Sequence, residues 1–380
     1  MIGTEGQYVF TYKLENAKDF ITENSFRSFV LSREAGGGLP TFYMTFETNQ
    51  IQILRYLNEG NLLTVSLGIT QKNAKETKLR LLGEPEISRL GNDKYLIKVS
   101  GIYAADNYFT GKSFISDKES GIAVLNKRAE LRGFSLNKDN LKTSLDSQCW
   151  VQLLLTDRRY FTHLLLHSDL PNDSFPVMAI TSKGELRVFD FVKHVKKGYR
   201  YRLTQSVSKS NDIVYSSDIV FPKDKSNILN FWLGYLSDKP VLDLVEGGYI
   251  TYTEDVKNLL SINKDLPRLI SEEKRTEELG TIDDFVHKNY WRAYQRNLKS
   301  LVLFSRHKLG VNISKIYRDI EPLDIMQFID SDIGNSESSN PYLSGNYITT
   351  KVVESIVDRQ YGMYLEMTRE GMNEHKGNLK

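Results

Sequence analysis

The chain has 380 residues, of which 40% are hydrophobic, so about two or three globular domains are expected and general disorder is excluded. Fifty basic residues almost balance forty-eight acidic ones, and the absence of a long basic tract argues against a protein that wraps nucleic acid. The single cysteine, Cys149, excludes an intrachain disulfide, and no signal peptide or membrane-spanning run is visible, so a soluble protein made in the cytosol is expected.

Alternating residues predict β structure in the first third of the chain. In "LPTFYMTFET" (39–48) Phe42, Met44 and Phe46 recur with the period of a half-buried strand. Further strands are expected over 60–68 and 94–103, paired antiparallel because no helix of crossover length separates them. The run "AGGGLP" (35–40) does not lead from a strand into a helix as a phosphate-binding loop does, so it is interpreted as a flexible connector.

The pattern becomes helical at Ser116. Ser116 and Glu119 have the spacing of a capping box, and the apolar stripe that follows stops before Gly133, a residue type that commonly ends helices. A second helix is predicted over 157–167, followed by a hairpin over 174–191 with a tight Ser-Lys-Gly turn. This middle segment is therefore expected to mix helices and strands.

The run "KHVKKGYRYR" (193–202) interleaves basic residues with tyrosines. A solvated edge strand, whose lysines discourage pairing, is the favoured interpretation, and contact with nucleic acid is the alternative.

The last part of the chain predicts a charged excursion, a helix and a second β region. The excursion spans 258–281 and the helix 282–298. Strands are expected over 300–306 and 323–330, and a polar Ser/Asn/Gly loop over 332–346 leads into a closing hairpin that ends near residue 373. The segments "NDKYLIKVSGI" and "SGNYITTKVVESI" echo each other weakly, as two related small barrels would.

Candidate chemistry is sparse. His163 and His167 have the i, i+4 spacing of metal ligands, but Leu164 stands where a zincin helix needs its glutamate, and no third ligand is evident. Cys149 and His287 have the separation seen in papain-like proteases without the flanking pattern, and His287 falls in a predicted helix. No Gly-x-Ser-x-Gly elbow is present. We therefore expect no catalytic residue, metal or cofactor.

The order of these elements resembles that of the baseplate hub proteins of contractile-tailed bacteriophages, whose relatives include the spike-carrying proteins of contractile secretion systems. The segments that carry the resemblance are "SGNYITTKVVESIVDRQYGMYLEMTREGMN", "IYRDIEPLDIMQFID", "GKSFISDKESGIAVLNKRAELRGF" and "SDLPNDSFPVMAITSKGELRVFD". The family often has Gly-Asp in the turn before its barrel-closing strand, whereas this chain has Pro322-Leu323-Asp324.

The resemblance implies an α+β, β-rich fold with two tail-tube-like antiparallel β-barrels and an α/β insertion between them. The corresponding domains are a first barrel over 1–115, the insertion over 116–200, a helical and charged excursion with part of the second barrel over 201–288, and the rest of that barrel over 289–375. It further implies a non-enzymatic homotrimer. Its pseudo-six-fold ring would adapt the hexameric tail tube to the trimeric central spike and leave a channel for DNA.

The implied partners are other copies of the chain, the central spike protein, the tail tube or a tube initiator, other baseplate proteins and the tape measure protein, with genomic DNA only in passage. The implied location is the virion tail baseplate, assembled in the host cytoplasm. A tail-associated cell-wall hydrolase and a glycan- or receptor-binding tail component remain as alternatives. The aromatic run "YWRAY" (290–294) could stack on sugars, but packing within a helix is favoured.

Two turns and one strand position are the candidate interface residues. The turns would dock the tail tube, and the strand position would close the second barrel, so that a proline there should prevent ring assembly. These residues are Asn58, Glu59, Gly60 and Asn61 in the first turn, Asp319, Glu321, Pro322 and Asp324 in the second, and Val352 in the closing hairpin.

Overall fold

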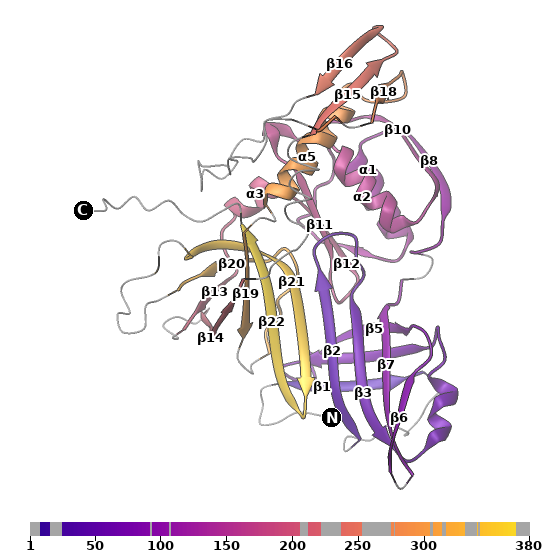
Figure 1. Cartoon of the computed structure of the whole chain (residues 1–380), viewed down its shortest axis with the longest axis vertical. Coiled ribbons are helices and arrows are strands. Elements are labelled where there is room, and N and C mark those ends of the chain that lie inside the picture. Colours follow the sequence, from indigo (N-terminus) through magenta and orange to yellow (C-terminus); the bar gives the residue numbers. More distant parts are fainter. Residues whose placement is uncertain are drawn as a thin grey trace, which may run out of the picture.

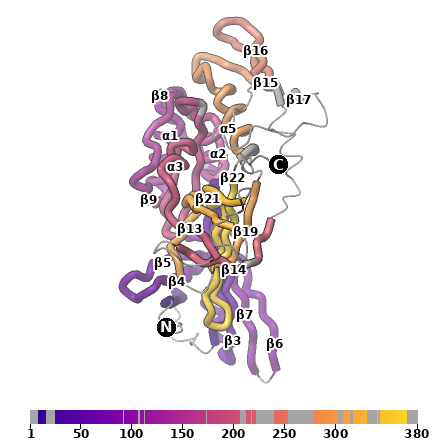
Figure 2. The backbone as a smooth tube through the Cα atoms, turned by 90° about the vertical axis from the view of Figure 1, so that its left-hand side faces the viewer, coloured from indigo at the N-terminus to yellow at the C-terminus, as the bar shows by residue number. Residues whose placement is uncertain are grey.

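The computed structural model shows two β-barrel regions with a mixed α/β insertion above them (Figures 1 and 2). No helix in the described part of the chain is long and apolar enough to cross a membrane. The residues that the structure describes are 8–15, 25–91, 93–105, 108–205, 212–221, 237–252, 275–276, 278–304, 307–313, 317–330, 340 and 343–369.

The first barrel is a curled sheet with the order β1-β4-β5-β7-β3-β2. The alternation predicted for 39–48 is confirmed, because Phe42, Met44 and Phe46 are buried in β3 while Thr41 and Tyr43 are exposed. A short strand, β6, extends the sheet beside β7, and a 3-10 helix, η1, precedes β4. The elements are β1 (Val9–Leu14), β2 (Phe26–Glu34), β3 (Thr41–Thr48), η1 (Ile51–Tyr56), β4 (Leu62–Gly68), β5 (Lys75–Leu81), β6 (Glu86–Gly91) and β7 (Lys94–Tyr103).

The second barrel closes on itself in the order β21-β20-β13-β14-β19-β22, because β22 also pairs with β21. The predicted closing hairpin is confirmed, and its turn residues Asp358 and Arg359 both have positive φ, as a type I′ turn requires. All pairs are antiparallel except those of β13, which runs parallel to β14 and to β20. The strands are β13 (Tyr201–Thr204), β14 (Asp212–Val220), β19 (His307–Ile313), β20 (Ile325–Phe328), β21 (Gly345–Val357) and β22 (Gln360–Arg369).

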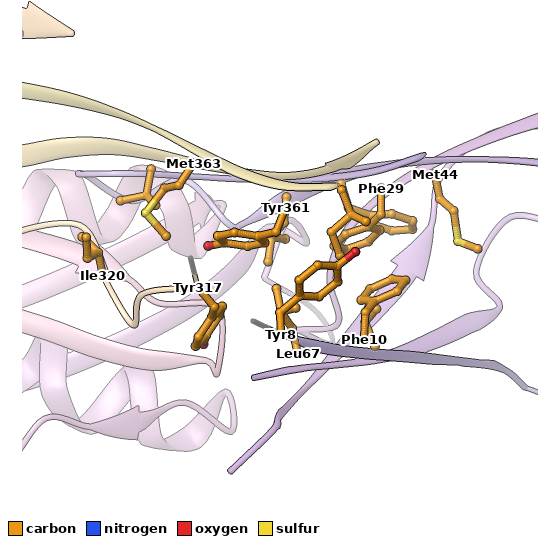
Figure 3. Close-up of a cluster of buried hydrophobic side chains, with 14 of the residues drawn as sticks. Tyr8, Phe10, Phe29, Met44, Leu67, Tyr317, Ile320, Tyr361 and Met363 are labelled. Carbon is orange, nitrogen blue, oxygen red and sulfur yellow. The ribbon is translucent and has the colours of Figure 1, made fainter. Parts of the chain in front are cut away.

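The two barrels share one sheet and one hydrophobic core. β2 pairs with β21 from Ser28↔Val357 to Glu34↔Lys351, so the sheet runs from one barrel into the other without a break. Figure 3 shows side chains of both barrels in one cluster, where the Tyr8 ring of the first barrel lies 5.8 Å from the Tyr361 ring of the second. The chain is β-rich and has two joined barrels and an inserted α/β segment. These features confirm the expected fold class.

The insertion packs α1 and α2 between a two-stranded sheet and a three-stranded sheet. The second predicted helix is confirmed as α2, and the predicted hairpin as β11 and β12. The elements of the insertion are β8 (Lys112–Glu119), α1 (Gly121–Leu131), β9 (Ser135–Leu136), β10 (Gln148–Leu155), α2 (Asp157–His167), η2 (Pro171–Asp173), β11 (Pro176–Ile180), β12 (Glu185–Asp190) and α3 (Phe191–Lys196). Later in the chain come a separate four-stranded sheet and a helix that packs on α2: β15 (Ser237–Asp243), β16 (Gly248–Tyr252), β17 (Arg275–Thr276), β18 (Gly280–Ile282) and α5 (Tyr290–Phe304).

The start of α1 differs from the prediction. Ser116 and Glu119 lie in β8, which pairs with β10, and the cap is Ser120, whose Oγ accepts from the Ala123 N–H at 3.3 Å. Pairing with a strand about thirty residues away thus overrides the local capping-box signal. Gly133, with φ of 80°, follows the helix as expected. The domain boundaries stay a prediction, and β8 runs across the one expected after residue 115.

Two other predicted elements are wrong. Residues 300–304 are the last part of α5 rather than a strand, and α5 begins at Tyr290 rather than Ile282, because its buried face packs on α2. The run 193–202 contains the last part of α3 and the start of β13, and β13 lies between two strands rather than at an edge. Most of the predicted charged excursion and of the polar loop before the closing hairpin lies outside the described residues.

Gly184 places the tip of the β11–β12 hairpin against the first barrel. Its φ is +70°, and a Cβ there would lie 1.9 Å from the Tyr103 hydroxyl. We expect Gly184→Ala to cost about 1 to 3 kcal/mol, because the hairpin tip or the Tyr103 ring must move to make room for the methyl group. Gly198→Ala is the matched control, since Gly198 also has positive φ but its Cβ would have no heavy atom within 4 Å. Equal losses in thermal or urea unfolding would show that this contact does not hold the hairpin.

Candidate functional site at the junction of the two barrels

A tight turn brings the second barrel against the first barrel and the insertion. The Asp324 N–H donates to the Glu321 carbonyl at 3.1 Å, with Pro322 second and Leu323 third at φ of +73°. Proline in the second position and positive φ in the third are features of a type II turn, which usually has glycine where this chain has Leu323. The Leu323 side chain is buried with Ile348 and residues of the insertion, and this packing offsets the unfavourable backbone.

Arg33 of β2 lies at the centre of the junction and contacts two carboxylates. Its Nη1 donates to Glu354 of β21, its Nε lies 2.9 Å from Glu321 Oε2, and its Nη2 donates to the Ile320 carbonyl at 3.0 Å. All three charged side chains are buried. Tyr361 donates to the second Glu354 oxygen at 2.8 Å. One guanidinium therefore connects the first barrel to two segments of the second.

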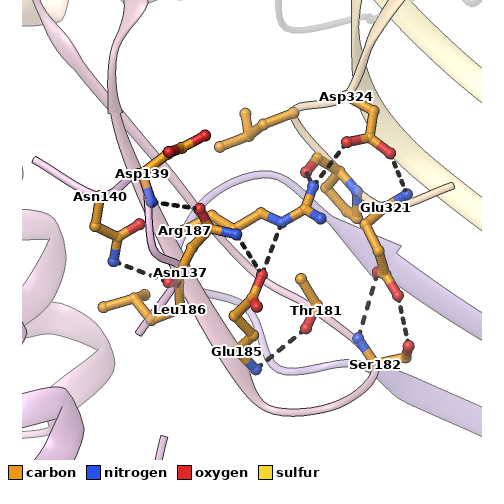
Figure 4. A network of polar contacts seen from close by, with 12 residues as sticks. Asn137, Asp139, Asn140, Thr181, Ser182, Glu185, Leu186, Arg187, Glu321 and Asp324 are labelled. Atoms are coloured by element: carbon orange, nitrogen blue, oxygen red, sulfur yellow. Dashed lines mark hydrogen bonds and ion pairs between the residues drawn. The ribbon is translucent and has the colours of Figure 1, made fainter. Parts of the chain in front are cut away.

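The insertion joins the same network. Ser182, in the β11–β12 turn, donates its hydroxyl to Glu321 at 2.6 Å, as Figure 4 shows. Burial raises the pKa of Glu321, while the Arg33 charge and the Ser182 hydrogen bond lower it by less. Arg187 of β12 donates to Asp324 at 2.9 Å, and Arg200 donates to the other Asp324 oxygen at 2.8 Å. The turn is thus held by all three parts of the chain.

The buried centre of the junction, beside Arg33, has no room for a substrate, and a separate cavity of about 570 Å³ is lined by Leu323, Ile348 and Lys351. The cavity beside Arg33, Glu321 and Glu354 has a volume of about 20 Å³, close to that of one water molecule. The paired carboxylates share a cation and hydrogen-bond donors that hold them in place, and none is directed into an open cleft. This arrangement instead attaches the two barrels rigidly to each other and to the insertion.

The predicted interface residues lie in different surroundings. Glu321, Pro322 and Asp324 are buried in the junction, where they contact other parts of the same chain, and Asp319 at its edge pairs with Lys75 of β5. Docking of the tail tube on this turn stays a prediction, and the role that the structure supports is intramolecular.

The first predicted turn is at the surface. Asn58 and Glu59 are exposed, and Arg80 donates to the Gly60 carbonyl at 2.6 Å, which fixes the turn before β4 together with Asn61. Its contact with another protein stays a prediction.

His163 and His167 belong to an aromatic stack between α2 and α5. The His167 ring lies 3.8 Å from that of Tyr290 and 4.9 Å from that of Tyr294, and the Tyr290 hydroxyl is 3.2 Å from His163 Nε2. Among the described residues no three metal-binding side chains come together. The first and last tyrosines of "YWRAY" therefore pack within the chain, as the sequence favoured.

Burial lowers the pKa of both histidines, and that of His167 falls well below its usual value. Because the unfolded chain binds these protons more readily, stability is complete above about pH 6.5 and is lost as the pH falls toward the folded pKa. We expect a loss of about 1.4 kcal/mol per pH unit for His167 in that range. His167→Phe should reduce the dependence of urea unfolding on pH between 6.5 and 5, and an unchanged slope would contradict the assignment.

Cys149 and His287 come near each other through the backbone. The Cys149 N–H donates to the Phe285 carbonyl at 3.2 Å, and the His287 N–H donates to the Gln148 side chain at 2.8 Å. His287 precedes α5 rather than lying in a helix, which corrects the prediction, and its Nδ1 accepts from the Asn289 N–H. With Nδ1 accepting from the backbone, the proton of the neutral ring lies on Nε2, so neither ring nitrogen is left to accept the thiol proton.

The fold has counterparts among solved structures of tail proteins. It matches the tail protein from Neisseria meningitidis MC58 with a TM-score of 0.59 and 12% identity, covering 96% of this chain and 97% of that one. It matches the 43 kDa tail protein of prophage MuSo2 from Shewanella oneidensis with a TM-score of 0.52 and 9% identity, covering 95% and 96%.

A third match is the E. coli c3393 protein, described as a type VI secretion system component similar to the T4 tail proteins gp27 and gp5. The TM-score is 0.53 and the identity 10%, covering 96% of this chain and 79% of that one. No protein-family model matches the sequence, and no curated protein matches it. The resemblance to the tail hub fold that the element order predicted is confirmed over nearly the whole chain.

Proposed function

We propose that this chain is a hub subunit of a phage tail baseplate and works as a homotrimer. The observation that carries the proposal is the pair of barrels joined through β2 and β21, in a fold that matches tail proteins over at least 95% of the chain. Three chains with two similar barrels each present six near-equivalent units, which a six-fold tube can meet on one side and a three-fold spike on the other.

The junction network supports this role. A ring of six barrels needs a fixed angle between the two barrels of each chain. Arg33, Glu321 and Glu354 hold that angle from the first barrel, the turn and β21, while Arg187 and Ser182 attach the insertion to the same turn. The proposed partners are the spike protein, the tail tube or its initiator, other baseplate proteins and the tape measure protein, in a virion tail assembled in the host cytoplasm with a channel through which DNA passes.

The experiment is a mass measurement combined with imaging. The purified chain, alone and co-expressed with the spike protein of the same genome, is examined by light scattering and negative stain. We expect a species of three times the 43.7 kDa chain mass, with six lobes around a central opening, at least when the spike is present. A strictly monomeric particle without a ring in the presence of the spike would refute the proposal.

A further inference from the structure

The outer face of the sheet formed by β8 and β10 carries a group of exposed apolar side chains, here called the flank patch. Ile115 and Val151 lie opposite each other in the register of the two strands, and Leu153 follows Val151 on the same face. Ile115 and Leu153 are each 68% exposed, and Leu154 beside them is 79% exposed. The inner face of the sheet is different, because Trp150 is buried against the helices of the insertion.

Single exposed apolar residues are ordinary, but this group is contiguous and held in place by an unfavourable backbone. Leu154 has φ of +51°, a conformation that a leucine rarely adopts, at an irregularity in the pairing between Gln152 and Leu155. Gly111 permits it, since a Cβ at Gly111 would lie 2.5 Å from the Leu154 carbonyl. Bulges of this kind redirect a side chain, here an apolar one toward solvent. Such a conformation persists only where the surrounding structure holds it in place.

The position of the patch indicates what covers it. Figure 1 places β8 and β10 on the same side of the molecule as β5, β6 and β7 of the first barrel, and the second-barrel strands β13, β14 and β19 on the opposite side. In a ring that sets the first barrel of one chain beside the second barrel of the next, this side faces the neighbouring copy. Tube and spike would instead meet the two ends of the ring.

We propose that the flank patch is a contact surface for a second copy of this chain, made by the insertions above the barrel ring. The inference rests on the proposed trimer and adds a lateral contact outside the barrels. Because the contact is heterologous, the patch meets a different surface of the neighbour, and three such contacts close a three-fold ring. The patch is apolar, as the buried centre of a stable interface is, and its burial would remove an aggregation hazard.

Two substitutions test the contact between copies without disturbing the folding of the chain. Leu154→Gly removes the most exposed side chain of the patch at a backbone conformation that glycine prefers, so unfolding stability should be kept or increased. Leu153→Glu places a charge in the contact. We expect each to weaken trimer formation about tenfold or more in mass photometry. Leu244→Glu is the matched control, at a residue that is 59% exposed directly after β15 and outside the β8–β10 sheet, and should leave assembly unchanged.

A photocrosslink identifies the occupant. With p-benzoylphenylalanine in place of Ile115 and the spike protein co-expressed, the expected adduct has twice the chain mass. An adduct that contains the spike, or no adduct in particles that are trimeric by light scattering, would overturn the flank contact while leaving the proposed trimer intact. If the unmodified chain never trimerises, the hub proposal fails and the flank contact fails with it.

Discussion

Replacing Arg33 with methionine is expected to destabilise the folded chain by about 3 to 5 kcal/mol, the usual cost of removing one partner from a buried ionic network. The variant leaves Glu321 and Glu354 in the interior without their shared cation, although Tyr361 and Ser182 still donate to them. Methionine keeps a long unbranched chain, so little packing is lost. Urea unfolding followed by circular dichroism measures the effect.

The same strand provides the control. Arg27 of β2 also pairs with a glutamate, Glu47, at 2.7 Å, but its side chain is 43% exposed. Arg27→Met should therefore cost only about 0.2 to 1 kcal/mol, as exposed ion pairs do. Similar losses for the two variants would mean that the junction network does not hold the barrels together.

The Arg33→Met variant should also respond to pH in a specific direction. Burial already raises the pKa of Glu321 in the unmodified chain, and loss of the guanidinium raises it further. The folded variant then binds protons that the unfolded chain releases, so its stability increases as the pH falls toward the ordinary glutamate pKa of about 4.3. The stability difference between variant and unmodified chain should accordingly be smaller at pH 5 than at pH 8. A stability difference that does not change with pH would show that the loss of stability does not come from the unpaired carboxylates.

The local sequence pattern was sufficient to predict those helices and strands that are determined by their own residues. The helix over 157–167 has a capping residue before it and an apolar stripe, and the structure reproduces both bounds. The strand around Phe42 and the closing hairpin were predicted from alternation and turn composition, and both are in place. The prediction failed where a distant strand competes with local signals, as at Ser116, which pairs with Trp150 instead of capping a helix.

The junction was not predicted, although part of its signal is in the sequence. Along β2, Phe29, Leu31 and Arg33 are all on the buried face, and a charged residue in the third place of such a series is unusual. Along β21, Glu354 interrupts a buried series in the same way, between Val352 and Ile356. Each position indicates a buried charge that needs a partner. Which partner it finds depends on the pairing of β2 with β21, across 321 residues of sequence, and no local pattern determines that.

Val352→Pro is expected to destabilise the folded chain strongly and to prevent assembly. β21 lies between two strands, and Val352 is opposite Arg33 of β2 on one side and Leu365 of β22 on the other. A proline there removes a ladder donor whichever neighbour accepts it, and the Val352 side chain is fully buried. Together these losses should cost on the order of 3 kcal/mol or more.

Val352→Ala separates the two causes, because it truncates the side chain and keeps the N–H. Its expected cost is roughly 1 to 3 kcal/mol, with assembly retained. Because β21 belongs to the shared sheet, the proline should affect the first barrel too, so unfolding should remain a single transition shifted to lower urea rather than split into two. A proline variant that folds and forms trimers with the spike would show that the closing hairpin is dispensable. In that case, three chains could present six equivalent barrels without a continuous sheet through β21.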